Sequence, residues 1–145
     1  MRHVRPTALL ATAIVAALSL SGCNVLAPTR DAAGLIVGEV QMPSTDAWVG
    51  DCFNFVENSN FSYATVVPCT EQHSYVVIGK GTLSDRRIAR FDNIQVALIQ
   101  LCQSTFDAYA ADKNPAPEPQ YIVARNTLPD GSEITNYSCL ATDAA

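Results

Sequence analysis

The segment CTEQHS, from Cys69 to Ser74, holds the residue types best suited to acid–base chemistry in this chain. His73 is one of two histidines, and the other lies at position 3. It could act as a general base beside Glu71 or Ser74. However, neither a third group that would orient the imidazole nor a glycine-rich nucleophile turn is visible nearby. We therefore interpret His73 as a ring that hydrogen-bonds a turn, and we expect no catalytic residue, cofactor or metal site.

Two further features could bind a partner. Trp48 could offer a stacking surface for the sugar rings of a cell-wall polymer, although a tryptophan at the start of a strand more often lies in the core, which is the interpretation we favour. The cluster Arg86, Arg87 and Arg90 could contact an anionic wall polymer or an acidic patch on a protein. Such clusters more often only keep a loop solvated. The candidate binding residues are therefore Trp48, Glu71, His73, Arg86, Arg87 and Arg90.

The chain has five cysteines, an odd number. Four of them are widely spaced, at Cys52, Cys69, Cys102 and Cys139. None of these has another cysteine within ten residues, so the close ligand pairs typical of a structural zinc site are missing. An even number of cysteines in an exported chain indicates disulfides, with three connectivities open.

Cys23 is the fifth cysteine, and it follows an export signal. Arg2 and Arg5 precede an uncharged apolar run over residues 8–20, which is the layout of a secretory signal peptide and is too short for a permanent bilayer span. The next residues, LSGC from Leu20 to Cys23, resemble the bacterial lipobox of leucine, small residue, glycine and cysteine. The resemblance implies cleavage before Cys23 and attachment of lipid through its sulfur.

This anchor would hold the protein on the outer face of the bacterial plasma membrane, since two or three acyl chains bind stably where one is marginal. Without Arg2 and Arg5, seven lysines and arginines remain against fourteen acidic residues, a formal net charge of −7. Such an acidic chain is a poor binder of nucleic acid and of anionic lipid headgroups. The expected partners are the membrane, through the lipid on Cys23, and an envelope protein or wall polymer, with no nucleic acid.

The predicted secondary structure reduces the number of possible cysteine pairings. The segments AWVGDCFNFV and FSYATVVPC are rich in β-branched and aromatic residues, and the turn-forming ENSN lies between them, which predicts a hairpin. In a hairpin centred near Asn60, facing residues have numbers that sum to about 120. Cys52 and Cys69 sum to 121, so we expect them to form a disulfide.

One main helix is predicted over Asp92–Ala111, where apolar residues recur at intervals of three and four. Asp92 and Gln95 form a variant of the capping box at its start. A strand over Ser74–Gly81 is expected before the helix, and a second hairpin around the turn PDGS is expected after it.

Cys139 on the last predicted strand can then bond Cys102 on the buried face of the helix. The elements predict an α+β domain, a small antiparallel sheet with one main helix packed on it and two disulfides. The predicted organisation is a signal peptide over residues 1–22, a tether over 23–46 with a candidate edge strand at Leu35–Val40, the stapled domain over 47–141, and a tail over 142–145.

Several segments of the predicted domain match one known family. WVGDCF, then VPCTEQH, a helix carrying a cysteine and a final strand with another cysteine resemble the septum formation domain of actinobacterial exported proteins over about residues 47–141. The segment LPDGSEITNYSC has the glycine of that family but lacks its tryptophan, and HSYVV lacks the acidic residue that often follows the histidine. The resemblance implies a role in division or in the cell envelope.

The expected function is that of a lipid-anchored, non-enzymatic cell-envelope module that binds a protein partner or wall polymer. The alternatives are an enzyme acting on envelope material and a small-ligand-binding lipoprotein. A deep pocket around His73 and Glu71 would favour one of these alternatives, whereas a filled core would favour the module.

Overall fold

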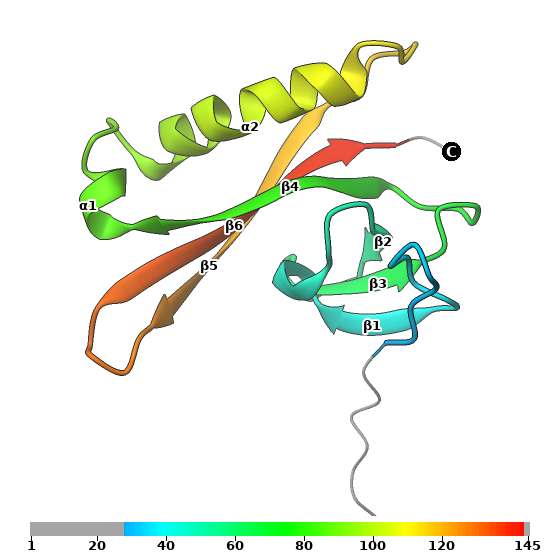
Figure 1. Ribbon diagram of the computed structural model, residues 1–145, viewed down its shortest axis with the longest axis horizontal. Helices are drawn as coiled ribbons and strands as arrows, with labels where there is room; N and C mark the ends of the chain where they lie inside the picture. The colour runs from blue at the N-terminus through cyan, green and yellow to red at the C-terminus, as the bar shows by residue number, and fades with distance from the viewer. Residues whose placement is uncertain (1–27, 144–145) are drawn as a thin grey trace, which may run out of the picture.

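The structure is a computed structural model that describes residues 28–143. Within this range lie six strands, two α-helices and one short 3-10 helix (Figure 1). In chain order they are β1 (Val40–Pro43), η1 (Ser44–Asp46), β2 (Cys52–Phe55), β3 (Tyr63–Val67), β4 (Tyr75–Ser84), α1 (Asp85–Ile88), α2 (Ile94–Ala110), β5 (Pro119–Thr127) and β6 (Glu133–Thr142). The predicted signal peptide and the lipobox at Cys23 lie outside the described residues and stay predictions.

The six strands form one antiparallel sheet in the order β1-β3-β2-β4-β6-β5. The long strands β4, β6 and β5 make one half of the sheet, and the shorter strands β1, β3 and β2 make the other (Figure 1). Helix α2 packs on β4 and β6. The predicted fold class, an antiparallel sheet with one main helix packed on it, is confirmed.

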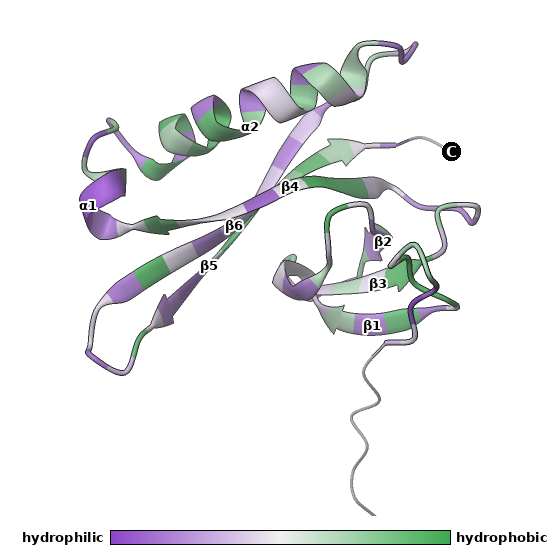
Figure 2. Ribbon diagram, viewed as in Figure 1, coloured by the Kyte–Doolittle hydropathy of each residue, from purple (hydrophilic) through white to green (hydrophobic). Residues whose placement is uncertain are grey.

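Helix α2 begins two residues later than predicted because Asn93 caps it. The Asn93 side-chain oxygen accepts a hydrogen bond from the N–H of Val96 at 3.0 Å. This bond satisfies one of the free donors of the first helical turn. The capping box predicted from Asp92 and Gln95 is therefore wrong by one residue. Hydrophobic and hydrophilic residues alternate along α2 in Figure 2, as expected for a helix with one face on a sheet.

Both predicted disulfides are confirmed. The Cα atoms of Cys52 and Cys69 lie 5.1 Å apart, and those of Cys102 and Cys139 lie 5.6 Å apart. In the first hairpin Cys52 faces Val67, so the facing numbers sum to 119, close to the predicted value. The first bond closes the β2–β3 hairpin, and the second fastens α2 to β6.

The sheet has a separate hydrophobic core on each face, because successive side chains of a strand point to opposite faces. The core beneath α2 contains Cys52, Val76, Ile78, Cys102, Cys139 and Ala141. The core on the other face contains Ile36, Ala47, Phe53, Ala64, Val66, Val77, Ile122 and Leu140. The second core extends toward the pocket described below.

Residues 28–46, predicted to be a tether, instead pack on the domain. Strand β1 pairs with β3, so the edge strand lies at Val40–Pro43 and not at Leu35–Val40. Further upstream, Arg30 and Ile36 form a β-bridge, and Ile36 is buried in the second core. The short, mixed sequence gave no local sign of this, because the partners of the segment lie later in the chain. At the other end β6 includes Thr142, the first residue of the predicted tail.

Candidate functional site

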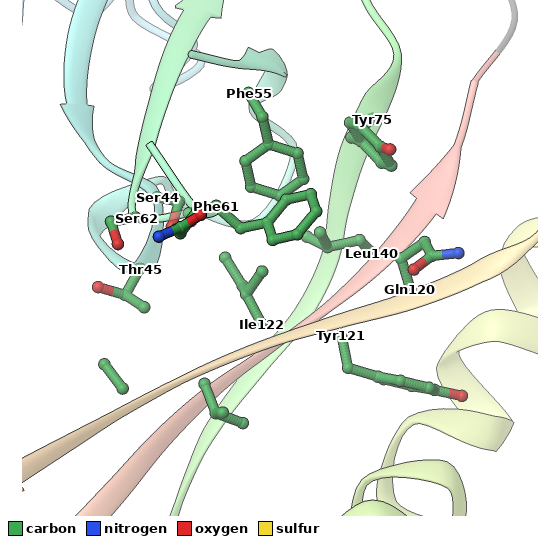
Figure 3. A pocket seen from close by; sticks show the side chains of 13 residues that line it. Ser44, Thr45, Phe55, Phe61, Ser62, Tyr75, Gln120, Tyr121, Ile122 and Leu140 are labelled. Carbon is green, nitrogen blue, oxygen red and sulfur yellow. The ribbon is translucent and has the colours of Figure 1, made fainter. Parts of the chain in front are cut away.

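A pocket of about 390 Å³ opens on the face of the sheet opposite α2. Its lining comes from η1, β2, the β2–β3 loop, β4, β5 and β6, so segments far apart in the sequence meet there (Figure 3). Its apolar side chains are Phe55, Phe61, Tyr75, Ile122 and Leu140, and its polar ones include Ser44, Thr45, Asn60, Ser62 and Gln120.

Aromatic rings pack against one another from the core out to this pocket. The ring centroid of Phe55 lies 5.1 Å from that of Phe53, which is fully buried, and 5.0 Å from that of Tyr75. On its other side it lies 4.9 Å from Phe61 in an edge-to-face arrangement. Such pairs contribute about 0.5–1.5 kcal/mol each beyond the area they bury. The core therefore supports the aromatic wall of the pocket.

Phe61 has 65% of its surface exposed at the pocket, and its backbone is strained. Its φ is +64°, and Asn58 and Asn60 in the same loop also have positive φ. Asparagine tolerates this left-handed conformation, but for a bulky residue it costs roughly 1–2 kcal/mol. The Ser44 hydroxyl, which donates to the Phe61 carbonyl at 2.6 Å, helps to hold the loop. An exposed ring held at an energetic cost points to a functional role for Phe61.

Replacing Phe61 by glycine is expected to change the free energy of unfolding by less than about 1 kcal/mol, because relief of the strained φ offsets the lost aromatic pair and the added chain entropy. Denaturant unfolding measures this change. Phe53→Ala in the buried core is the comparison, with an expected loss of about 3–5 kcal/mol. A loss near that size for Phe61→Gly would make Phe61 a structural residue and contradict a role in binding.

The pocket borders the free edge of β5, which is the outermost strand on one side of the sheet (Figure 3). The Thr142 N–H donates to the Glu118 carbonyl at 3.0 Å, and the β5–β6 register continues from there without a shift. Antiparallel pairs alternate between bonded and non-bonded positions, so the N–H and C=O groups of Tyr121, Val123 and Arg125 point away from β6. Tyr121 and Val123 also line the pocket. The site therefore combines an apolar pocket with unpaired strand backbone.

Lys80 of β4 fixes the wall that η1 contributes to the pocket. Its Nζ donates to the carbonyls of Thr45 and Ala47, each at 2.6 Å. Desolvation lowers the pKa of Lys80, while the charges of Asp46 and Asp51 act in the opposite direction. Together with the Ser44 hydroxyl, this ammonium group holds η1 in place from two sides.

His73 is buried outside the pocket lining, as the turn interpretation predicts. Its Nδ1 donates to the Glu71 carbonyl at 2.7 Å, and the Glu71 side chain is exposed. Its Nε2 has no hydrogen-bond partner among the described residues and lies 3.8 Å from Oδ2 of Asp143. The Tyr109 hydroxyl donates to the same oxygen at 2.7 Å, and burial, followed by this bond, raises the pKa of Tyr109. His73 thus lies beside Asp143, near the end of the described chain, whose carboxylate also contacts Tyr109 of α2.

A second depression, of about 460 Å³, lies beside Asp143 and the link from Lys113 to Glu118. Neither His73 nor Glu71 lines it. A deep pocket at these two residues would have favoured an enzyme or a small-ligand binder, and they line neither this depression nor the pocket opposite α2.

Trp48 is 58% exposed, so the core placement favoured from the sequence is wrong. The Arg30 guanidinium lies 4.0 Å from its ring centroid. Arg30 also donates to both carboxylate oxygens of Asp51 at 2.6 and 2.8 Å, and this bond raises the pKa of Arg30. Asp51 is 2% exposed and accepts the Trp48 N–H at 2.7 Å. The ring is held outside the core because the turn from Trp48 to Asp51 wraps around this carboxylate.

The three arginines lie at the opposite end of β4 from His73. Arg86 and Arg87 belong to α1 and Arg90 follows it, and all three are exposed. The ten residues of β4 separate them from the CTEQHS segment. The structure therefore does not bring the six candidate binding residues together.

Sequence reasoning missed the pocket residues and the burial of Asp51 against Arg30. In the sequence, the aromatic residues of β2 and β3 indicate only a hairpin, and no local pattern marks Gln120 or Ile122 as pocket residues. One usable signal was Phe61 directly after ENSN, since a large apolar residue at the end of an asparagine-rich turn has no obvious place in the core.

Comparison with profiles of protein families, with characterised proteins and with solved structures found no match to this chain. Among residues 28–143, no helix is long and apolar enough to cross a membrane. Over the same residues, no group of three or more histidine, cysteine, aspartate and glutamate side chains is placed to hold a metal ion. Function is therefore inferred from the residues themselves.

Proposed function

We propose that the chain is a lipid-anchored, non-enzymatic module of the bacterial cell envelope, of the septum formation type, which binds an extended segment of a protein partner outside the membrane. The observation that supports this is the pocket beside the free edge of β5. An edge strand offers unpaired N–H and C=O groups to an incoming strand, and a neighbouring pocket selects one of its side chains. The acidic mature chain fits a partner with basic residues.

The chemistry of the pocket supports binding over catalysis. None of the side chains that line it is a carboxylate, imidazole, thiol or amine. Aromatic and aliphatic groups face it, and its polar groups are hydroxyls and amides, which bond peptide groups without demanding a charge. We expect an aliphatic or aromatic side chain of the partner to occupy it.

The volume of the pocket supports small-ligand binding as a second candidate, because ligand pockets measure about 300–1,000 Å³. A small ligand would contact the rings of Phe55 and Phe61 but would not need the backbone of β5. The two candidates therefore differ in their dependence on the strand edge.

The substitution Val123→Pro tests the edge. Proline removes one outward N–H and is tolerated on edge strands, while Val123→Ala keeps that N–H and serves as the matched control. Thermal unfolding first checks that both variants are folded. Capture of the partner by cross-linking in cells should then be lost for Val123→Pro and kept for Val123→Ala. Equal capture by the two variants would rule out strand pairing at the edge of β5.

The anchor is tested separately at Cys23. Cys23→Ala should abolish lipid attachment, because the thioether requires the sulfur, and should leave the protein either uncleaved or shed from the membrane. Labelling with a palmitate analogue, followed by membrane fractionation, measures both effects. Ser19→Ala, just outside the lipobox, should label like the unaltered chain. Unchanged labelling of Cys23→Ala would contradict the proposed lipid anchor.

A further inference from the structure

Four exposed apolar side chains lie where the chain enters the folded domain, and we name them the arm patch: Leu35, Val37, Trp48 and Val49. Their exposed fractions are 39%, 57%, 58% and 57%. Leu35 and Val37 flank the buried Ile36, so they point outward from the segment that Ile36 fastens to the core. Leu35 also lies next to Gly50, in the turn that carries Trp48 and Val49. The two segments that carry the arm patch therefore meet where Leu35 lies against Gly50.

The charges beneath the arm patch are neutralised within the protein. Arg30 lies over the Trp48 ring, but its guanidinium is paired with both oxygens of Asp51, and the side chains of the pair are 10% and 1% exposed. Because the pair is already largely shielded from water in the folded protein, covering the surface above it removes little further hydration from these charges. The exposed acids Asp31 and Glu39 flank the patch, which makes a neutral surface a better partner than an anionic one.

The predicted anchor lies close to the arm patch along the chain. Cys23 precedes Arg30 by seven residues, which can span at most about 25 Å. Arg30 is fixed to Asp51, directly beside Trp48 and Val49. A short linker gives the groups at its two ends an effective concentration in the millimolar range, so even a weak contact is populated. A membrane that holds the lipid on Cys23 is thus always within reach of the arm patch.

We propose that the arm patch rests on the surface of the bilayer that holds the anchor. The occupant is a lipid surface, because exposed tryptophan with neighbouring aliphatic side chains is the composition that settles at the boundary between headgroups and acyl chains. The contact fixes the orientation of the domain on the membrane. The proposal rests on the lipid anchor of the proposed function, but the test below supplies the anchor chemically.

Trp48 is the only tryptophan of the chain, so its fluorescence reports the arm patch alone. With both disulfides formed, Cys23 is the only free thiol of residues 23–145 and can be coupled to a maleimide lipid in phosphatidylcholine vesicles. On coupling, we expect a shift of the emission to shorter wavelength and quenching by brominated lipid in the bilayer. Val49→Asp should lose both effects, while Ile99→Asp, on the exposed side of α2, should keep them.

An unchanged emission spectrum with no quenching after coupling would overturn the proposal. A blue shift that grows with protein concentration in the absence of vesicles would also overturn it, because it would assign the arm patch to a second copy of the chain. Neither result depends on lipidation in the cell, which the Cys23→Ala labelling experiment tests by itself.

Discussion

Replacing Cys102 and Cys139 together by alanine is expected to lower the free energy of unfolding by about 4 kcal/mol, because their bond closes a loop across a sequence separation of 37 residues. Both cysteines are buried, at 1% and 3% exposure, so alanine adds a loss of packing and no clash. A domain of this size has a net stability of only about 5–15 kcal/mol. The bond that ties α2 to β6 should therefore decide whether the domain stays folded.

Denaturant unfolding of the double variant measures this loss. The double variant Cys52→Ala and Cys69→Ala is the matched comparison, with a smaller expected loss of about 3 kcal/mol, because its bond spans 17 residues. If the Cys102 and Cys139 variant unfolded at the same denaturant concentration as the unaltered protein, the helix would not depend on this bond.

Asp51→Ala is expected to destabilise the protein by about 1.5–3 kcal/mol, because it leaves the partly buried Arg30 guanidinium without its charged hydrogen-bond partner. The Arg30 side chain is only 10% exposed and has both carboxylate oxygens of Asp51 within 2.8 Å. The same substitution frees the Trp48 N–H, which Asp51 accepts. Thermal or denaturant unfolding measures the loss.

A double variant, Arg30→Met with Asp51→Leu, provides the control. Replacing both charges by apolar groups of similar size should restore part of the stability lost in Asp51→Ala, since no buried charge remains unpaired. If Asp51→Ala unfolded like the unaltered protein, residues 28–39 would not be docked on the domain, and the arm patch would lose its basis.

The sequence predicted the elements whose signals are local. The β2–β3 hairpin followed from two β-rich segments around ENSN, and its centre was close enough to pair Cys52 with Cys69. The helix followed from its apolar period, and Cys102 on its buried face fitted Cys139 on β6. The hairpin and the helix depend on residues near one another in the chain, and once Cys52 is paired with Cys69, only Cys102 and Cys139 remain among the four cysteines of the domain.

The features that depend on distant residues were not predicted. The segment before β1 is held by Arg30 on Asp51 and by Ile36 in the core, and neither contact has a local pattern. Trp48 was placed in the core because of its type, yet the turn around Asp51 keeps it outside. The pocket arises from β2, β4 and β5 meeting across the sheet, so its residues could be identified only after the strand order was known.

A photo-reactive amino acid at Gln120, used in living cells, tests most directly whether the pocket and the β5 edge bind a protein. Gln120 is exposed and lines the pocket, and the same probe at Gln100, exposed on α2, is the matched control. We predict that illumination yields a discrete protein adduct from Gln120 and none from Gln100, and that adding Val123→Pro removes it. The same adduct from both positions, or no protein adduct from Gln120, would contradict binding at this site.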